Sequence, residues 1–226
     1  MSRRRRKNNT QSTKRLSPKT ENQAEYIRTM VENDVTICSG PAGSGKTAVA
    51  VGLACDHLLD NKVEKIIITR PVVESGKGLG FLPGTFAEKI HPYLVPVLEE
   101  MNKYFAPAAL SKMQAENIIE VCPLEYMRGR NFHNSFMILD EAQNATFEQI
   151  KMFVTRIGRE SKAVINGDID QSDLPSRVRG GLEKCMDSLE NIKGVGISEL
   201  DREDIIRNRL ISKILEHLNN SHDEFY

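Results

Sequence analysis

The chain has 226 residues, 39% of them hydrophobic and 27% charged, a mixture typical of a single globular domain and not of a disordered, collagen-like or disulfide-rich chain. The formal net charge is zero, but the first 19 residues hold eight of the 31 Lys and Arg and no acidic residue, so the remainder is acidic. No segment approaches the roughly 18 apolar residues of a membrane-spanning helix, and no apolar signal segment follows the basic N-terminus. We therefore expect a cytoplasmic protein without membrane contact.

Residues 1–19 lack apolar periodicity and are rich in Ser, Thr, Asn, Lys and Arg, so we predict a disordered basic tail. Such a tail would bind nucleic-acid phosphates without sequence preference. The alternative is a solubilising or autoinhibitory arm on an acidic body. The predicted folded domain covers residues 20–220, followed by a short C-terminal tail at residues 221–226.

Within the predicted domain, short apolar runs alternate with longer helical patterns. The predicted strands are Val35–Ser39, Lys65–Thr69, Ile118–Cys122, Ser135–Asp140, Lys162–Asn166 and Val195–Glu199. The predicted helices are Thr20–Met30, Lys46–Asp60, Phe86–Tyr104, Thr146–Ile157 and Glu203–Leu218, the first and fourth opening on capping boxes. Near-continuous apolar strands alternating with helices predict an α/β fold, a doubly wound and mostly parallel sheet with helices on both faces. The Gly-rich segment Pro71–Pro83 is a candidate functional loop.

A phosphate-binding motif joins the first predicted strand to the next helix. The sequence there matches GxxxxGK[ST] and consists of Gly40, Pro41, Ala42, Gly43, Ser44, Gly45, Lys46 and Thr47. Glycines let successive backbone N–H groups turn toward phosphate oxygens, and the helix N-terminus adds its positive dipole. In this interpretation Lys46 reaches the β- and γ-phosphates and Thr47 binds Mg²⁺. The alternative is a Gly-rich turn without a ligand.

Two acidic residues, Asp140 and Glu141, end the buried run that starts at Ser135. The carboxyl ends of parallel strands are where open α/β sheets bind ligands, so Asp140 is a candidate for the Mg²⁺ shell. Glu141 would orient and deprotonate a water in line with the γ-phosphate, which indicates hydrolysis as well as binding. Alternatively, both acids only cap the following helix.

A third polar group follows the run Lys162–Asn166. Gln171 is the candidate sensor of the γ-phosphate, and Asp168 would support the Mg²⁺ shell or Lys46. An ordinary Gly-Asp turn is the alternative. Gln23 also has two interpretations, as a capping-box partner of Thr20 and as a side chain that pairs with the adenine edge.

Together these segments resemble the PhoH family of ATPases, relatives of the superfamily 1 helicase core, from about Ser17 to Leu218. The resemblance depends on GPAGSGKT at 40–47, TRPVVESGKGLGFLPGTFAEKIHPY at 69–93, PLEYMRGRNFHNSFMILDEAQNAT at 123–146, EQIKMFVTRIG at 148–158 and NGDIDQSDLP at 166–175. It implies a RecA-like P-loop NTPase that binds and hydrolyses ATP with Mg²⁺. It also implies ring-shaped homo-oligomers, such as hexamers, acting on single-stranded nucleic acid, with RNA favoured over DNA. By position it favours the adenine interpretation of Gln23. Longer relatives carry further domains, and we expect this chain to be the ATPase part alone.

Because one RecA-like core has no second core to close against, we expect a neighbouring subunit to supply an arginine to the site. The candidates are Arg130, Arg156, Arg177, Arg179 and Arg207. Arg70 and Lys77 flank the Gly-rich loop, which we expect near the nucleic-acid path. Two other function classes compete: a small-molecule kinase with Arg177 and Arg179 as a lid, and an assembly switch that binds ATP without motor activity.

Overall fold

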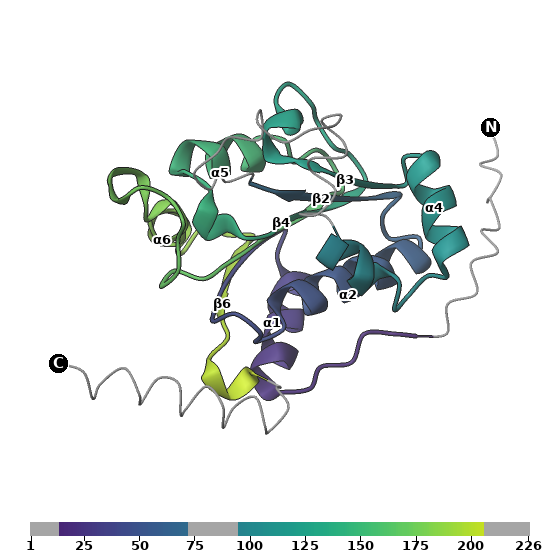
Figure 1. The fold of residues 1–226 in the computed structure, drawn as a ribbon, viewed down its shortest axis with the longest axis horizontal. Coiled ribbons are helices and arrows are strands. Elements are labelled where there is room, and N and C mark those ends of the chain that lie inside the picture. Colours follow the sequence, from purple (N-terminus) through teal and green to yellow (C-terminus); the bar gives the residue numbers. More distant parts are fainter. Residues whose placement is uncertain (1–13, 72–94, 206–226) are drawn as a thin grey trace, which may run out of the picture.

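The computed structural model describes residues 14–71 and 95–205, which form a six-stranded sheet with helices on both sides (Figure 1). Its strands are β1 (Val35–Ser39), β2 (Lys65–Arg70), β3 (Ile119–Pro123), β4 (Ser135–Leu139), β5 (Lys162–Gly167) and β6 (Val195–Glu199). They are arranged in the order β3-β2-β4-β5-β1-β6, and every neighbouring pair is parallel. The doubly wound parallel sheet predicted from the sequence is therefore confirmed.

Each face of the sheet has its own apolar core, because successive side chains of a strand point to opposite faces. Ile66 and Ile68 of β2 lie in one core, whereas Ile67 between them lies in the other. The helices are α1 (Glu21–Glu32), α2 (Lys46–Leu59), α4 (Pro107–Ala115), α5 (Phe147–Val154) and α6 (Gly181–Leu189). Helices α1, α2 and α4 cover the first core, and α5 and α6 cover the second, on the opposite side of the sheet in Figure 1.

Helices α4 and α6 were not predicted. Helix α4 follows Ala106 with a proline at its start and buries only Leu110 and Met113, so its apolar pattern is short. Helix α6 begins directly after Gly180, whose backbone is in the left-handed conformation. Gly180 and Gly181 form a Gly-Gly pair, which is more typical of a loop. The spacing of its buried residues, Leu182, Cys185 and Met186, is nonetheless that of one helical face.

Several other predictions fall partly outside the described residues. Residues 95–101 are helical, whereas the rest of the predicted helix before them lies at positions that the structure does not describe. The candidate loop beyond Pro71, with Lys77, also lies outside the described residues, as does the predicted final helix beyond residue 205. Of that predicted helix the structure describes only its start, where the short 3-10 helix η5 spans Arg202–Asp204. Within residues 14–71 and 95–205, no helix combines the length and apolar content needed to cross a membrane.

The segment just before α1 contacts the domain. The Leu16 backbone N–H donates to Asp56 Oδ2 over 3.1 Å, and the Leu16 side chain packs against the first core. Arg15 forms an ion pair with Asp60, 2.8 Å apart. Contacts with the domain therefore begin earlier than the predicted boundary at residue 20, while residues 1–13 lie outside the described part of the chain.

The four cysteines are buried and unpaired, as expected of reduced thiols. Burial raises the pKa of Cys122 to about 12 and that of Cys185 to about 11. A thiol that keeps its proton at neutral pH is a poor nucleophile and a poor metal ligand. These side chains therefore serve the packing of the cores.

A stability prediction concerns Gly181, at the start of α6. A Cβ atom there would lie 2.6 Å from the backbone nitrogen of Phe147 and 2.7 Å from the backbone oxygen of Ala145. Because both are backbone atoms, they cannot turn away, and we expect Gly181→Ala to lower the free energy of unfolding by about 1–3 kcal/mol. Urea unfolding measures this change. The control is Ser188→Ala, at an exposed position on the same helix, whose free energy of unfolding should stay within about 0.5 kcal/mol of the wild type. Equal urea midpoints for the two variants would contradict the close backbone approach at Gly181.

Candidate nucleotide-binding site

The predicted site residues come together at the carboxyl edge of the sheet, where β4, β5 and β1 are consecutive neighbours. A cavity of about 720 Å³ lies there, a size in the usual range of ligand pockets. Its lining includes Gln23, Ala42, Gly43, Gly45, Lys46, Thr47, Asp140, Glu141 and Gln171. Residues that are up to 148 positions apart in the sequence thus face one cavity.

The loop between β1 and α2 has the backbone of a phosphate cradle. Gly43 and Gly45 have φ angles of 87° and 94°, a left-handed conformation that favours glycine. No side chain caps the start of α2 at Gly45, so its first N–H groups can serve an anion. Lys46 Nζ donates to the backbone oxygens of Gly40 and Pro41, which holds the ammonium group against the loop.

Asp140 directly follows β4, and its side chain is only 2% exposed. The Thr47 hydroxyl donates to its Oδ1 over 2.8 Å, and Arg70 Nε donates to its Oδ2 over 2.9 Å. Thr47 and Asp140 are therefore close enough to serve one metal ion. A hydroxyl and a carboxylate, completed by phosphate oxygens and water, are the ligands that Mg²⁺ prefers, so the residues present fit this ion.

Glu141 has an unusual backbone conformation for a residue other than glycine, with φ 57° and ψ 40°. Its side chain is 47% exposed and lines the cavity, and its Oε2 accepts a hydrogen bond from Gln143 Nε2 over 2.7 Å. Such left-handed residues cost about 1–3 kcal/mol and cluster at functional sites. Asp140 and Glu141 therefore differ in exposure, although both line the same cavity.

Gln143, which was not singled out from the sequence, joins two parts of the site. Its Nε2 contacts Glu141, and its Oε1 accepts the backbone N–H of Asp168 over 3.1 Å. Asp168 is buried, and its carbonyl accepts the backbone N–H of Gln171 over 3.2 Å. Gln171 thus belongs to a hydrogen-bonded turn and also lines the cavity, and its role as a sensor stays a prediction.

The same two loops are joined a second time, through Asn144 of the first loop and Asp173 of the second. Asn144 Nδ2 donates to Asp173 Oδ2 over 3.0 Å, and the Asp173 backbone N–H donates to Asn144 Oδ1 over 2.8 Å. The Ser172 hydroxyl donates to the backbone oxygen of Gln143 over 2.9 Å. The loops after β4 and β5 are therefore held together as one unit. Only their tertiary placement shows this, because the partners lie 29 residues apart.

Gln23 also lines the cavity, next to the phosphate loop, and is 4% exposed. Its backbone N–H donates to the Thr20 hydroxyl over 3.2 Å, which is half of the predicted capping box. Its side chain does not complete the box but accepts the Lys19 N–H and donates to the Ser44 oxygen, both over 2.9 Å. Gln23 thus joins the segment before α1 to the phosphate loop.

Asp204 also lines the cavity and was not predicted from the sequence. Its side chain is buried and binds the Thr20 hydroxyl and Asn22 Nδ2, as well as the backbone N–H of Asp201. Burial on its own would raise the pKa of Asp204, but these hydrogen bonds outweigh it and hold the pKa below its ordinary value. They connect the segment after β6 to the start of α1.

The arginines considered for a neighbouring site differ in their surroundings. Arg130 binds Glu120 through two guanidinium nitrogens, and Arg156 donates to two backbone oxygens. Arg179 Nε donates to a backbone oxygen in its own loop. Arg177 is exposed, and within the described ranges no hydrogen bond or ion pair of its side chain is present. Arg207 lies outside those ranges.

Known proteins resemble this chain in both sequence and fold. The family model described as PhoH-like protein matches residues 15–219. The PhoH-like protein of Mycobacterium bovis is 46% identical over 203 residues, which are 90% of this chain and 58% of that protein. The PhoH-like protein of Bacillus subtilis is 44% identical over 203 residues, 90% of this chain and 64% of that protein. Protein PhoH of Escherichia coli K12 is 38% identical over 205 residues, which are 90% of this chain and 58% of that protein.

This chain therefore spans about three fifths of the length of these relatives. Among solved structures, the large terminase of a thermophilic bacteriophage has a TM-score of 0.57 at 13% identity, covering 88% of this chain and 50% of that one. A second structure of that terminase, in complex with ADP, has a TM-score of 0.55 at the same identity. This match covers 87% of this chain and 49% of the terminase chain. At this identity the likeness concerns the fold alone. The chain has the fold of a RecA-like P-loop NTPase and belongs to the PhoH-like protein family.

Proposed function

We propose that the chain is an ATPase that requires Mg²⁺. The observation that carries the proposal is the hydrogen bond between Thr47 of the phosphate loop and Asp140 after β4, in a cavity that Lys46 and Glu141 also line. The candidate phosphate loop, the two candidate metal ligands and the candidate base thus lie around one cavity. A Gly-rich turn without a ligand would not require a buried carboxylate opposite Thr47.

In this function each residue has a separate task. The loop N–H groups and Lys46 bind the phosphates, and Thr47 and Asp140 hold the metal ion. When bound, Mg²⁺ neutralises charge on the β- and γ-phosphates. Glu141 accepts a proton from the attacking water, whose oxygen forms a bond to the γ-phosphorus while the bond to the β–γ bridging oxygen breaks. ADP leaves with the electron pair of that bond.

The turn at Glu141 supports hydrolysis over transfer to a bound acceptor. Its carboxylate lines the cavity beside Asp140 and is partly exposed, where water can reach it. The two arginines of the alternative kinase lid, Arg177 and Arg179, are not among the described residues that line the cavity. A small-molecule kinase is therefore the weaker proposal.

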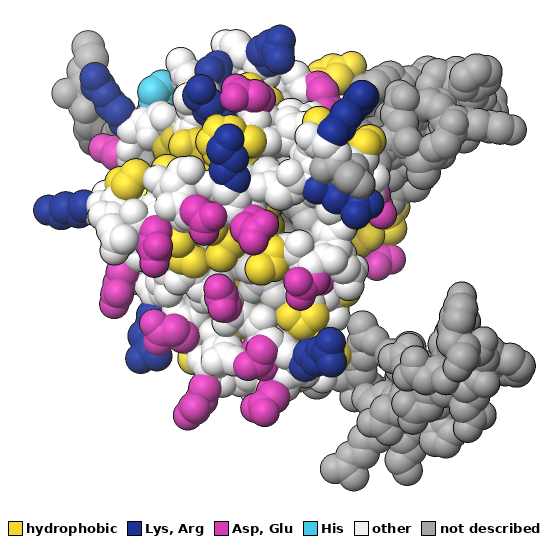
Figure 2. All heavy atoms as spheres, turned by 90° about the vertical axis from the view of Figure 1, so that its left-hand side faces the viewer, with side chains coloured by type: hydrophobic (Ala, Val, Ile, Leu, Met, Phe, Trp, Pro, Cys, Tyr) yellow, Lys and Arg dark blue, Asp and Glu magenta, His cyan; other side chains and the backbone are white. Residues whose placement is uncertain are grey.

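We further propose that single-stranded nucleic acid, RNA more than DNA, stimulates the ATPase. Figure 2 shows that Asp and Glu predominate over the lower half of one face, so a phosphate backbone would avoid that area. Tyr126, 52% exposed, follows β3 at the same edge of the sheet as the cavity, and Arg128 beside it is exposed. An exposed aromatic ring beside a cation suits a stacked base and its phosphate.

We also propose that the ATPase works as a ring-shaped homo-oligomer. The loop after β5 exposes Ile169 (46%), within the turn from Asp168 to Gln171, and Val178 (37%) further along, with Arg177 next to Val178. Exposed apolar side chains beside an arginine suit a subunit contact better than free solvent.

Phosphate release with and without single-stranded RNA tests the proposed function. We expect Mg²⁺-dependent release of phosphate from ATP that rises with RNA and less with DNA of the same length. Release that requires a metabolite acceptor would instead support the kinase, and tight ATP binding without turnover would support the assembly switch. Native mass spectrometry of the same samples, with an ATP analogue and RNA, measures the number of subunits, and a monomer under all conditions would contradict the ring.

A further inference from the structure

Arg70, the last residue of β2, lies in the nucleotide cavity, although its sequence neighbours suggested a place on the nucleic-acid path. The pairing of the strands explains this position. Strands β2 and β4 are neighbours with Thr69 opposite Leu139, and the Asp140 N–H donates to the Thr69 oxygen over 2.9 Å. The next residue of each strand is therefore brought to the same point at the edge of the sheet.

The guanidinium group of Arg70 lies beside both carboxylates after β4. Nε donates to Asp140 Oδ2 over 2.9 Å, and a terminal nitrogen binds the same oxygen. That nitrogen is 4.0 Å from Glu141 Oε1. The Arg70 side chain is 14% exposed, so this positive charge is held within the site and not in bulk water.

We propose that Arg70 is a catalytic residue that binds the terminal phosphate of ATP within its own chain, an assignment that rests on the proposed ATPase function. The attacking water must lie within hydrogen-bond distance of Glu141 and next to the γ-phosphorus. A guanidinium nitrogen 4.0 Å from Glu141 Oε1 is therefore in reach of the γ-phosphate oxygens. The planar guanidinium with its five N–H donors matches the geometry of phosphate oxygens.

Two positive charges of the same chain then face the terminal phosphate. Lys46 approaches it from the phosphate loop and Arg70 from the end of β2, and both line the cavity with Glu141. Charge that develops on the phosphate oxygens in the transition state is stabilised by donors that are already in place. In this scheme hydrolysis does not require an arginine from a neighbouring subunit.

The test compares the affinities of ATP and ADP, because only ATP carries the terminal phosphate. We expect Arg70→Gln to bind ADP within about threefold of the wild type, since an amide still donates to Asp140. The affinity for a non-hydrolysable ATP analogue should fall about 10- to 100-fold, the worth of one charge-assisted hydrogen bond. Single-turnover hydrolysis should slow by about 10²–10³. Arg70→Lys should recover part of the ATP affinity, because it keeps the charge but loses the planar fork.

The control is Arg15→Gln, which changes another arginine of the cavity lining, one that pairs with Asp60 and not with Asp140 or Glu141. It should leave the ratio of ATP to ADP affinity unchanged. Equal losses of ATP and ADP affinity in Arg70→Gln would show that Arg70 only holds Asp140, and would overturn the proposal. If Arg70→Gln does not fold, Arg70→Lys provides the test. A folded Arg70→Lys with the wild-type ratio of ATP to ADP affinity and the wild-type rate of hydrolysis would also overturn the proposal. A wild-type chain that binds neither nucleotide would refute the proposed function itself.

Discussion

Glu141→Gln should bind ATP as tightly as the wild type and hydrolyse it about 10²–10⁴ times more slowly, which is the usual worth of a general base. The substitution keeps the size of the side chain and an oxygen that can accept the hydrogen bond from Gln143, which is 2.7 Å long in the wild type. It removes only the ability to take a proton from water. Binding should therefore be preserved while the chemical step is lost.

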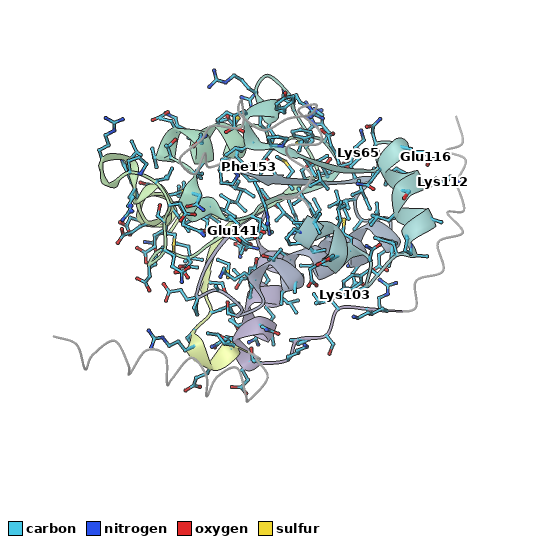
Figure 3. The ribbon with its side chains drawn as sticks, viewed as in Figure 1. Lys65, Lys103, Lys112, Glu116, Glu141 and Phe153 are labelled. Carbon is cyan, nitrogen blue, oxygen red and sulfur yellow. The ribbon has the colours of Figure 1, made fainter. Side chains whose placement is uncertain are left out.

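Single-turnover phosphate release and the affinity for labelled ATP separate these two effects. Glu116→Gln is a matched control, because Glu116 directly follows α4 and lies far from Glu141 in Figure 3. Its turnover should equal that of the wild type. Normal hydrolysis by the Glu141→Gln variant would rule out this carboxylate as the base and remove the main argument against a kinase.

Lys46→Ala should lower the affinity for ATP by about 10²–10⁴-fold. The ammonium group lies against the backbone oxygens of Gly40 and Pro41, where it can exchange those contacts for phosphate oxygens. Hydrogen bonds to charged groups contribute about 1.5–3 kcal/mol each, and two such bonds account for the expected loss. Stability should change little, because the two backbone oxygens can accept bonds from water.

Equilibrium binding of a labelled ATP, with thermal unfolding of the same sample, measures this effect. Lys112→Ala on α4 removes an exposed lysine that lies 3.9 Å from Glu116, and it should bind ATP like the wild type. ATP affinity within a factor of three of the wild type for Lys46→Ala would show that the loop does not bind phosphate through this side chain.

The strands were predictable from the sequence because a parallel sheet covered on both faces requires continuous apolar runs. The five residues of β4 are all buried, and its run was found within one residue of its observed end. The phosphate loop was predictable for a different reason: its glycines, Lys46 and Thr47 are contiguous, so short-range geometry decides their arrangement. Neither inference needed any knowledge of how the strands pair.

The position of Arg70 was not predictable in this way, because it depends on β2 lying next to β4. The motif around Arg70 suggested the nucleic-acid path, and only the strand order shows the carboxylate opposite it. The role of Gln143 was not predicted for the same reason, because its partner Asp168 lies 25 residues further along the chain. Gln23 was identified, but the partner of its side chain, the Ser44 oxygen, depends on where α1 packs.

The paired hydrogen bonds between Asn144 and Asp173 have a mechanical consequence. A loop that is fastened at several points cannot shift by itself, so any rearrangement beside Glu141 during the reaction cycle must pull the segment after β5 along with it. That segment exposes Ile169 to the outside. We therefore expect a movement beside Glu141 to reach this exposed side chain through hydrogen bonds that are already present.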